Sequence, residues 1–181
     1  YDYIVNNTEK SADKGHKTEE AINKIDEDLT RYLIDLSSEP LSQKESEVLT
    51  NILDSSRDLE RIGDHGEALI NLTDYIRRKK VEFSPAALQE LDLIYNMTLS
   101  FIKESLKSVE DNDIELANSL VAKHEAIDKM ERRLRKTHIH RLNRGECSTQ
   151  AGVNFIDIIS HYTRVADHAM NLAEKVQAEQ I

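Results

Sequence analysis

The sequence predicts an all-α protein built from two copies of a three-helix unit. Its 181 residues include only two prolines and five glycines, while Glu, Lys, Leu, Ala and Asp are abundant. This composition is typical of long helices. Apolar residues recur at helical spacing, and no strand-like alternation of any length stands out. The segment ERIGDH at 60–65 returns as TRVADH at 163–168, which indicates a duplicated supersecondary unit.

The first two helices follow from spacing and from start and stop signals. A first helix is expected over 17–38, with its apolar residues on one side and Pro40 after its end. Ser42 followed by Glu45 is a capping-box sequence, which opens a second helix over 43–81. The apolar residues expected on one side of the first helix are Ile22, Ile25, Leu29, Leu33 and Leu36.

Three more helices complete the chain. Ser84 and Pro85 provide an N-cap and a first helical residue for a third helix, which runs to about residue 110. Asp113 caps a fourth helix that continues to about residue 143. Gly145 ends that helix, and Ser148 begins a fifth that reaches the C-terminus.

The repeat places the second helix on the fifth and the first on the fourth. We therefore expect a single domain over 1–181, with repeat one at about 1–82 and repeat two at about 83–181. The same offset places the partner of the third helix at roughly residues 1–8. The opening YDYIVNN is then expected to be the tail of a truncated first helix, and the chain to be a fragment of a longer protein.

Composition also narrows the class of partner. The formal net charge of −10 repels nucleic acid and suits hard cations. The single cysteine, Cys147, excludes an internal disulfide and fits a reducing compartment. No apolar run is long enough for a transmembrane helix or a signal peptide.

The repeated segment of the second helix carries the strongest candidate site. Glu60 and Asp64 lie one turn apart on one arc, and Gly63 beside them lets another helix approach closely. Carboxylates on an inward arc need a cationic side chain or a metal ion. Arg61 and Arg164 are expected to point away from the arc, so a metal ion is the favoured compensation.

The second copy offers a weaker set of ligands. Asp167 is present, but Thr163 stands in the place of the glutamate. The fourth helix adds Glu125 and Asp128, three residues apart on one face. We therefore predict one well-furnished metal site in repeat one, and a second site in repeat two that is weakened or absent.

Plainer interpretations apply to the same residues. In a chain with 34 acidic residues, carboxylates one turn apart are common by chance and most lie on a solvated face. His65 and His168 occupy equivalent positions, but a structural or surface role is favoured over ligation for each histidine. The basic clusters at 77–80 and 129–144 complement helix dipoles, or else form a docking surface. No phosphate loop or nucleophile elbow is present.

The repeated segments also carry a family resemblance. ERIGDHGEAL, preceded by Asp58 and Leu59, resembles the signature helix of PhoU-domain proteins, and YTRVADHAMNLAE resembles its second copy. The resemblance implies two three-helix repeats, each with an E(D)-x-x-x-D motif, and in some members these motifs bind multinuclear iron or other metal clusters. The motif falls on Glu60 and Asp64, and on Thr163 and Asp167.

The facing helices complete what the resemblance implies about the site. Glu125 and Asp128 resemble the acidic pair of the facing helix, and Asn23 and Asp26 are its degraded counterpart. The implied cofactor is a divalent or trivalent metal ion: iron, zinc, magnesium or calcium.

The resemblance implies a regulatory role in phosphate uptake or phosphate signalling, with no catalysis. The partner would be a membrane phosphate transporter or the chain's own missing membrane domain, or a signalling kinase. A module appended to a sodium/phosphate cotransporter, at the cytoplasmic face of the membrane, is the expected setting, and a homodimer is compatible with it. The alternatives are a stand-alone regulator, a metal-free structural adaptor, and a metal-dependent oxidase or hydrolase.

Overall fold

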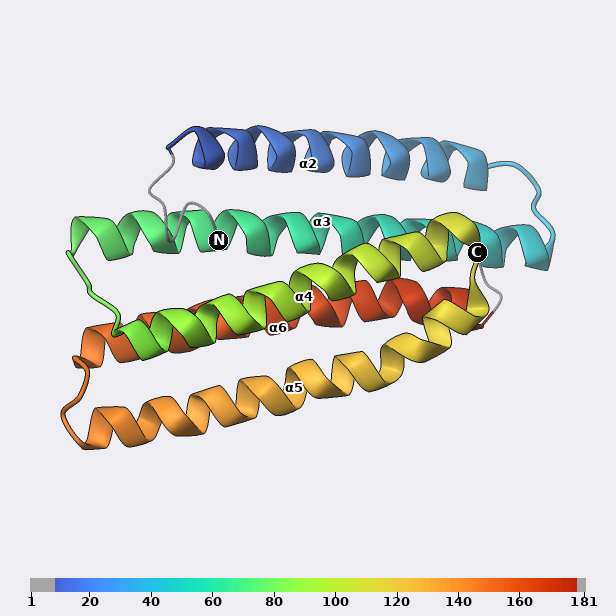
Figure 1. Cartoon of the computed structure of the whole chain (residues 1–181). Coiled ribbons are helices and arrows are strands. Elements are labelled where there is room, and N and C mark those ends of the chain that lie inside the picture. The colour runs from blue at the N-terminus through green and yellow to red at the C-terminus, as the bar shows by residue number, and fades with distance from the viewer. Residues whose placement is uncertain (1–8, 179–181) are drawn as a thin grey trace.

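A computed structural model describes residues 9–178, and all of the regular structure in that range is helical (Figure 1). This confirms the predicted fold class. The elements, in chain order, are α2 (Glu9–Ser37), α3 (Gln43–Arg78), α4 (Pro85–Asp111), α5 (Ile114–Asn143) and α6 (Thr149–Gln177). The predicted tail of a truncated helix at residues 1–8 lies outside the described residues.

Side-chain caps begin four of these helices at the predicted residues. Ser42 accepts a bond from the Glu45 amide, and the Glu45 carboxylate accepts one from the Ser42 amide, which closes the capping box. Ser84, Asp113 and Ser148 each accept a bond from the amide three residues further on. Each cap satisfies an amide that the helix leaves unpaired, and is worth about 1 kcal/mol.

The ends of two helices differ from the prediction. Helix α2 begins at Glu9 rather than near residue 17, because its polar first turns carry little apolar periodicity from which a start could be recognised. Ala12 in that stretch is nonetheless buried. Helix α3 ends at Arg78 rather than at 81, since Lys80 adopts a left-handed conformation with φ of 52°. Its basic last turn complements the helix dipole.

The helices form a long bundle whose two halves are unequal. Helices α4, α5 and α6 pack on one another in every pairing, so the second repeat is a closed three-helix unit. Among the described helices, α2 makes close backbone contact with α3 alone, and α3 also packs along α6 (Figure 1). The first repeat is therefore an open pair of helices in this part of the chain.

Helix α6 supplies most of the core. Phe155, Ile158 and Ile159 are fully buried in one cluster, and Ala166 and Ala169 lie in a second. Burying a large aliphatic or aromatic side chain contributes about 1.5–3 kcal/mol. On α2, by contrast, Leu33 is buried while Ile25 is 65% exposed, although the two were predicted to share a side. No helix among residues 9–178 is long and apolar enough to cross a membrane.

Candidate functional site

Three potential metal ligands meet between α5 and α6. The ligand atoms of His124, Asp128 and Asp167 all lie within 4.8 Å of one another. The Nε2 atom of His124 is 3.0 Å from an Asp167 carboxylate oxygen, and both side chains are partly shielded from solvent. One imidazole nitrogen and two carboxylate oxygens are a donor set that zinc and iron accept.

This cluster contains two of the five predicted ligands and one histidine that was not predicted to be one. Asp128 and Asp167 belong to it, but Glu125 does not: its side chain is 62% exposed and pairs with Lys129. The sequence carried a signal for His124, since the four-residue spacing to Asp128 places both on one helix face. The Thr163 hydroxyl donates a hydrogen bond to the Ile159 carbonyl of its own helix, 3.0 Å away.

The acidic residues of the first repeat lie close together but form no such cluster. Glu60 and Asp64 are partly shielded on α3, and Asp26 of α2 accepts a bond from the buried Ser56 at 2.6 Å. Burial, and then the charge of Asp64, raise the pKa of Glu60, with Asp26 and Glu19 adding to the effect. Within residues 9–178, no third ligand joins this pair at metal-binding separation.

The arginines of the motif behave differently from the prediction. The Arg61 guanidinium lies 3.2 Å from the Asp64 carboxylate and 3.6 Å from that of Glu60. The Arg164 guanidinium lies 3.4 Å from the Asp167 carboxylate. A three-residue spacing lets a long side chain fold over its own helix while its head stays in water. These exposed pairs offset only part of the carboxylate charge.

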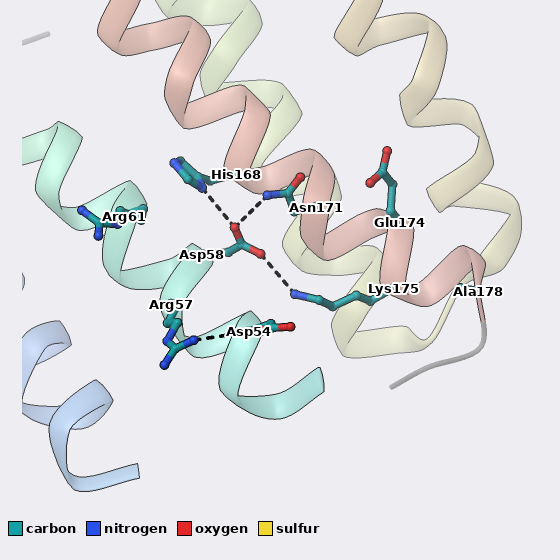
Figure 2. A pocket seen from close by; sticks show the side chains of 9 residues that line it. All are labelled: Asp54, Arg57, Asp58, Arg61, His168, Asn171, Glu174, Lys175 and Ala178. Atoms are coloured by element: carbon teal, nitrogen blue, oxygen red, sulfur yellow. Dashed lines mark hydrogen bonds and ion pairs between the residues drawn. The ribbon is translucent and has the colours of Figure 1, made fainter. Parts of the chain in front are cut away.

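A second polar cluster lies where α3 packs on α6. Asp58 of α3 accepts bonds from three α6 side chains: His168 at 3.0 Å, Asn171 at 2.8 Å and Lys175 at 3.1 Å (Figure 2). Burial alone would raise the pKa of Asp58, but the bonds from Asn171, His168 and Lys175 outweigh it, and the pKa is lowered. An open cavity of about 640 Å³ borders this network.

The same boundary holds a histidine pair. The Nδ1 atoms of His65 and His161 lie 3.1 Å apart, and the ring of His168 is 5.7 Å from that of His65. Burial lowers the pKa of His65, and the charges of His161 and His168 lower it further. Burial also lowers the pKa of His161. Both rings are therefore neutral near pH 7, which lets one N–H donate to the other ring.

Comparison with known proteins identifies what the chain resembles. A family model described as the PhoU domain matches residues 1–73 and 91–176. The chain is 32% identical, over 74% of its length, to a phosphate-specific transport system accessory protein PhoU homolog of Thermotoga maritima, and covers 56% of that protein. It is 28% identical, over 70% of its length, to the corresponding homolog of Streptococcus pneumoniae, and covers 57% of it. The aligned part thus spans little more than half of these relatives.

Two crystal structures share the fold. PhoU from Pseudomonas aeruginosa superimposes with a TM-score of 0.87 at 19% identity, covering 97% of this chain and 83% of the other. The phosphate transport system regulatory protein PhoU from Streptococcus pneumoniae gives a TM-score of 0.80 at 22% identity, covering 96% and 81%. Identities this low establish the helical architecture rather than a shared site.

Proposed function

The chain belongs to the PhoU domain family, and on that premise we propose that it is a regulatory module of phosphate transport that binds a metal ion in its second repeat. The convergence of His124, Asp128 and Asp167 from two helices carries the metal part of the proposal. The names of the relatives, accessory and regulatory proteins of phosphate transport, support the regulatory part. On this proposal the module acts by contact with a transporter, at the cytoplasmic face of the membrane, and not by catalysis.

The donor set favours a transition metal over magnesium or calcium. Magnesium and calcium prefer oxygen ligands, whereas an imidazole nitrogen suits zinc or iron. His124 and Asp128 would hold the ion from α5, and Asp167 would hold it from α6. The ion would neutralise the two carboxylates and fix the spacing of the helices. Glu60 and Asp64 stay a predicted site of the first repeat, and a metal there would need a third ligand brought in by side-chain movement.

Two settings for such a module are distinguishable. A stand-alone regulator would act on a separate phosphate transport system, as the names of the relatives describe for those proteins. A module joined to a sodium/phosphate cotransporter would act on its own membrane domain. The coding sequence on either side of the described chain separates the two: a run of apolar helices there would identify a cotransporter.

The regulatory proposal can be tested in bacteria that lack their own PhoU regulator. Radiolabelled phosphate uptake and a phosphate-starvation reporter are measured with and without the chain. We expect the chain to lower both, and the paired substitution Asp128→Asn and Asp167→Asn to abolish the effect. Glu125→Gln, at the exposed neighbour, is the matched control and should retain it. Unchanged uptake and reporter output with the folded chain present would contradict the regulatory role.

A further inference from the structure

Three histidines meet where α3 packs on α6. The ring centroid of His65 on α3 lies 5.2 Å from that of His161 and 5.7 Å from that of His168. His161 and His168 are seven residues, or about two turns, apart on α6, so both project from one face of that helix. His65 therefore has two imidazoles of the neighbouring helix close to its own ring. The metal site proposed for the second repeat uses none of these three side chains.

Two of their nitrogens are separated as ligands of one ion are. Nδ1 of His65 and Nδ1 of His161 lie 3.1 Å apart. Zinc binds imidazole nitrogens at about 2.0–2.1 Å, which places two such nitrogens roughly 2.9 Å apart at a right angle and roughly 3.4 Å apart at the tetrahedral angle. The observed separation falls between these values. An ion beside the pair would therefore reach both rings with little movement of either helix.

The protonation of the pair also suits a cation. Burial lowers the pKa of His65 and of His161, so both rings have the neutral form that a metal ion requires. The negative charges of Asp64 and Asp157 act in the opposite direction on the pKa of the neighbouring ring, and would attract a cation. Arg164 would repel it, but its side chain is 68% exposed and its charge is screened by water. Binding needs one ring to move its proton from Nδ1 to Nε2, and releases no net proton.

His168 has the arrangement of a third metal ligand. Its Nδ1 lies 3.0 Å from the Asp58 carboxylate, and its side chain is 23% exposed. Histidines that bind metal commonly hold their other ring nitrogen against a carboxylate in this way. Figure 2 shows the second nitrogen, Nε2, pointing away from Asp58. Among residues 9–178, three ligand atoms already lie within 4.8 Å of one another only in the second-repeat cluster, so here the third bond requires the His168 ring to turn.

We propose that His65, His161 and His168 form a second metal site, which takes a transition-metal ion that favours imidazole: zinc, nickel or copper. His65 and His161 would bind the ion through Nδ1 and His168 through Nε2, with water completing the coordination. The ligands of the second-repeat cluster all lie on α5 and α6. At the histidine site they come from α3 and α6, so the ion would fix the contact between the two repeats.

The histidine site is independent of the proposed function. It shares no ligand with the second-repeat cluster, and its metal binding is measured without a transporter. The plainer alternative is a pair of rings joined by a hydrogen bond alone, which predicts no affinity for metal. The repeat also explains why the boundary offers one such site: 103 residues before His161, the equivalent position is Asp58, a carboxylate.

Nickel titration tests the proposal. The chain is prepared without a histidine tag, stripped of metal with a chelator, and titrated with Ni²⁺ at pH 7.5 in a calorimeter. Asp128→Asn with Asp167→Asn is the background, because it removes the carboxylates of the second-repeat cluster. We expect the background to bind one nickel ion per chain. Adding His65→Gln and His161→Gln should weaken that binding by at least about tenfold, since the loss of an outer-shell partner alone costs this much.

A matched variant and a second measurement guard against a loss caused by misfolding. His140→Gln removes an exposed histidine of α5 and should leave nickel binding in the background unchanged. In the same background with its histidines labelled, Cu²⁺ added well below one equivalent should broaden the ring signals of His65 and His161 before those of His140. This nuclear magnetic resonance measurement leaves all three rings of the site in place.

Three results would overturn the histidine site. They are absence of nickel binding by the background, equal affinity with and without His65 and His161, and simultaneous broadening of these two rings and His140. If nickel binds the unmodified chain but not the background, the second-repeat cluster stands and the histidine site falls. If the background binds nickel as the unmodified chain does, and only the histidine substitutions weaken binding, the histidine site stands alone.

Discussion

His65 of α3 and His161 of α6 face each other across the boundary between these two helices. The repeat relates His65 to His168, and it relates His161 to Asp58. Both contacts are close: 3.1 Å between the two histidine nitrogens, and 3.0 Å between His168 and the Asp58 carboxylate. The boundary is thus built twice from one pattern, once with an imidazole as the partner and once with a carboxylate. The two versions respond to protons in different pH ranges.

The histidine pair predicts a loss of stability on mild acidification. Because burial lowers the pKa of His65 and of His161 in the folded chain, the neutral form is favoured there. The pair's contribution is therefore complete above the unfolded pKa of about 6.5, and is lost as the pH falls through the lower folded values. Urea unfolding at pH 7.5 and at pH 5.0 should show a smaller free energy of unfolding at the lower pH.

Replacing one partner should reverse this behaviour. His161→Asp recreates the arrangement around Asp58, and the new carboxylate raises the pKa of His65, so acidification to pH 5 should no longer weaken the fold through this pair. His140→Asp, on the exposed face of α5, is the control and should keep the profile of the unmodified chain. Parallel pH profiles for His161→Asp and the unmodified chain would rule out this role of the pair.

Asp58→Asn should destabilise the chain by roughly 2–4 kcal/mol near neutral pH, because it leaves the shielded Lys175 ammonium without its counter-charge. Since the folded pKa of Asp58 is lowered, the difference from the unmodified chain persists above the unfolded pKa of about 3.9 and shrinks as the pH falls below it. Asp54→Asn, which breaks only an exposed pair with Arg57, should cost less than about 0.5 kcal/mol. Equal costs for the two variants in urea unfolding would contradict the prediction.

Metal content should follow the second-repeat cluster. After incubation with zinc or ferrous iron and desalting, Asp128→Asn with Asp167→Asn should contain less metal per chain by elemental analysis than the unmodified protein. Glu125→Gln should retain the metal content of the unmodified protein. The paired substitution Glu60→Gln with Asp64→Asn should also retain it if the only tightly held ion is the one in repeat two. At 100 times its dissociation constant, a bound ion stabilises the fold by about 2.7 kcal/mol, so a chelator should lower the melting temperature. If the chain holds no metal and a chelator leaves its melting temperature unchanged, the alternative of a metal-free structural adaptor would be favoured.

Two glycines of α3 form a matched pair. A Cβ at Gly63 would come within 3.3 Å of the Ile22 side chain of α2, whereas a Cβ at Gly66 would meet nothing within 4 Å. Gly66→Ala should therefore stabilise the chain by up to about 1 kcal/mol, through helix propensity. Gly63→Ala should gain less or be destabilising, because it presses the two helices apart. Thermal unfolding compares them, and an equal gain for both would show that Ile22 does not pack closely on Gly63.

The fold was predictable because its determinants are local. The capping box at Ser42 and the N-caps at Ser84, Asp113 and Ser148 need only a few neighbouring residues, and the structure has all four where they were predicted. The start of α2 was missed because, among residues 10–18, whose burial the structure describes, Ala12 alone is buried. Burial of a small residue in a polar stretch depends on packing between elements, which the sequence of one helix does not describe.

The site was predictable only in part, because it depends on how two helices face each other. Asp128 and Asp167 were found from their motif, but whether His124 or Glu125 joins them depends on a rotation of about 100°, the angle between neighbours on a helix. The structure selects His124. The pairing of Arg61 with Asp64 was missed because the direction of the Cα–Cβ bond does not limit where a long side chain ends.

The arrangement of α2 has a mechanical consequence. Since α3 is its only close neighbour among the described helices, and α3 meets the second repeat along α6, the pair α2–α3 forms one arm of a lever and the three-helix unit forms the other. A small rotation of α3 on α6 would carry α2 through a longer path than any residue at the pivot. The histidine pair and the Asp58 network lie at this pivot, and the candidate metal ligands His124, Asp128 and Asp167 lie on the arm formed by the second repeat.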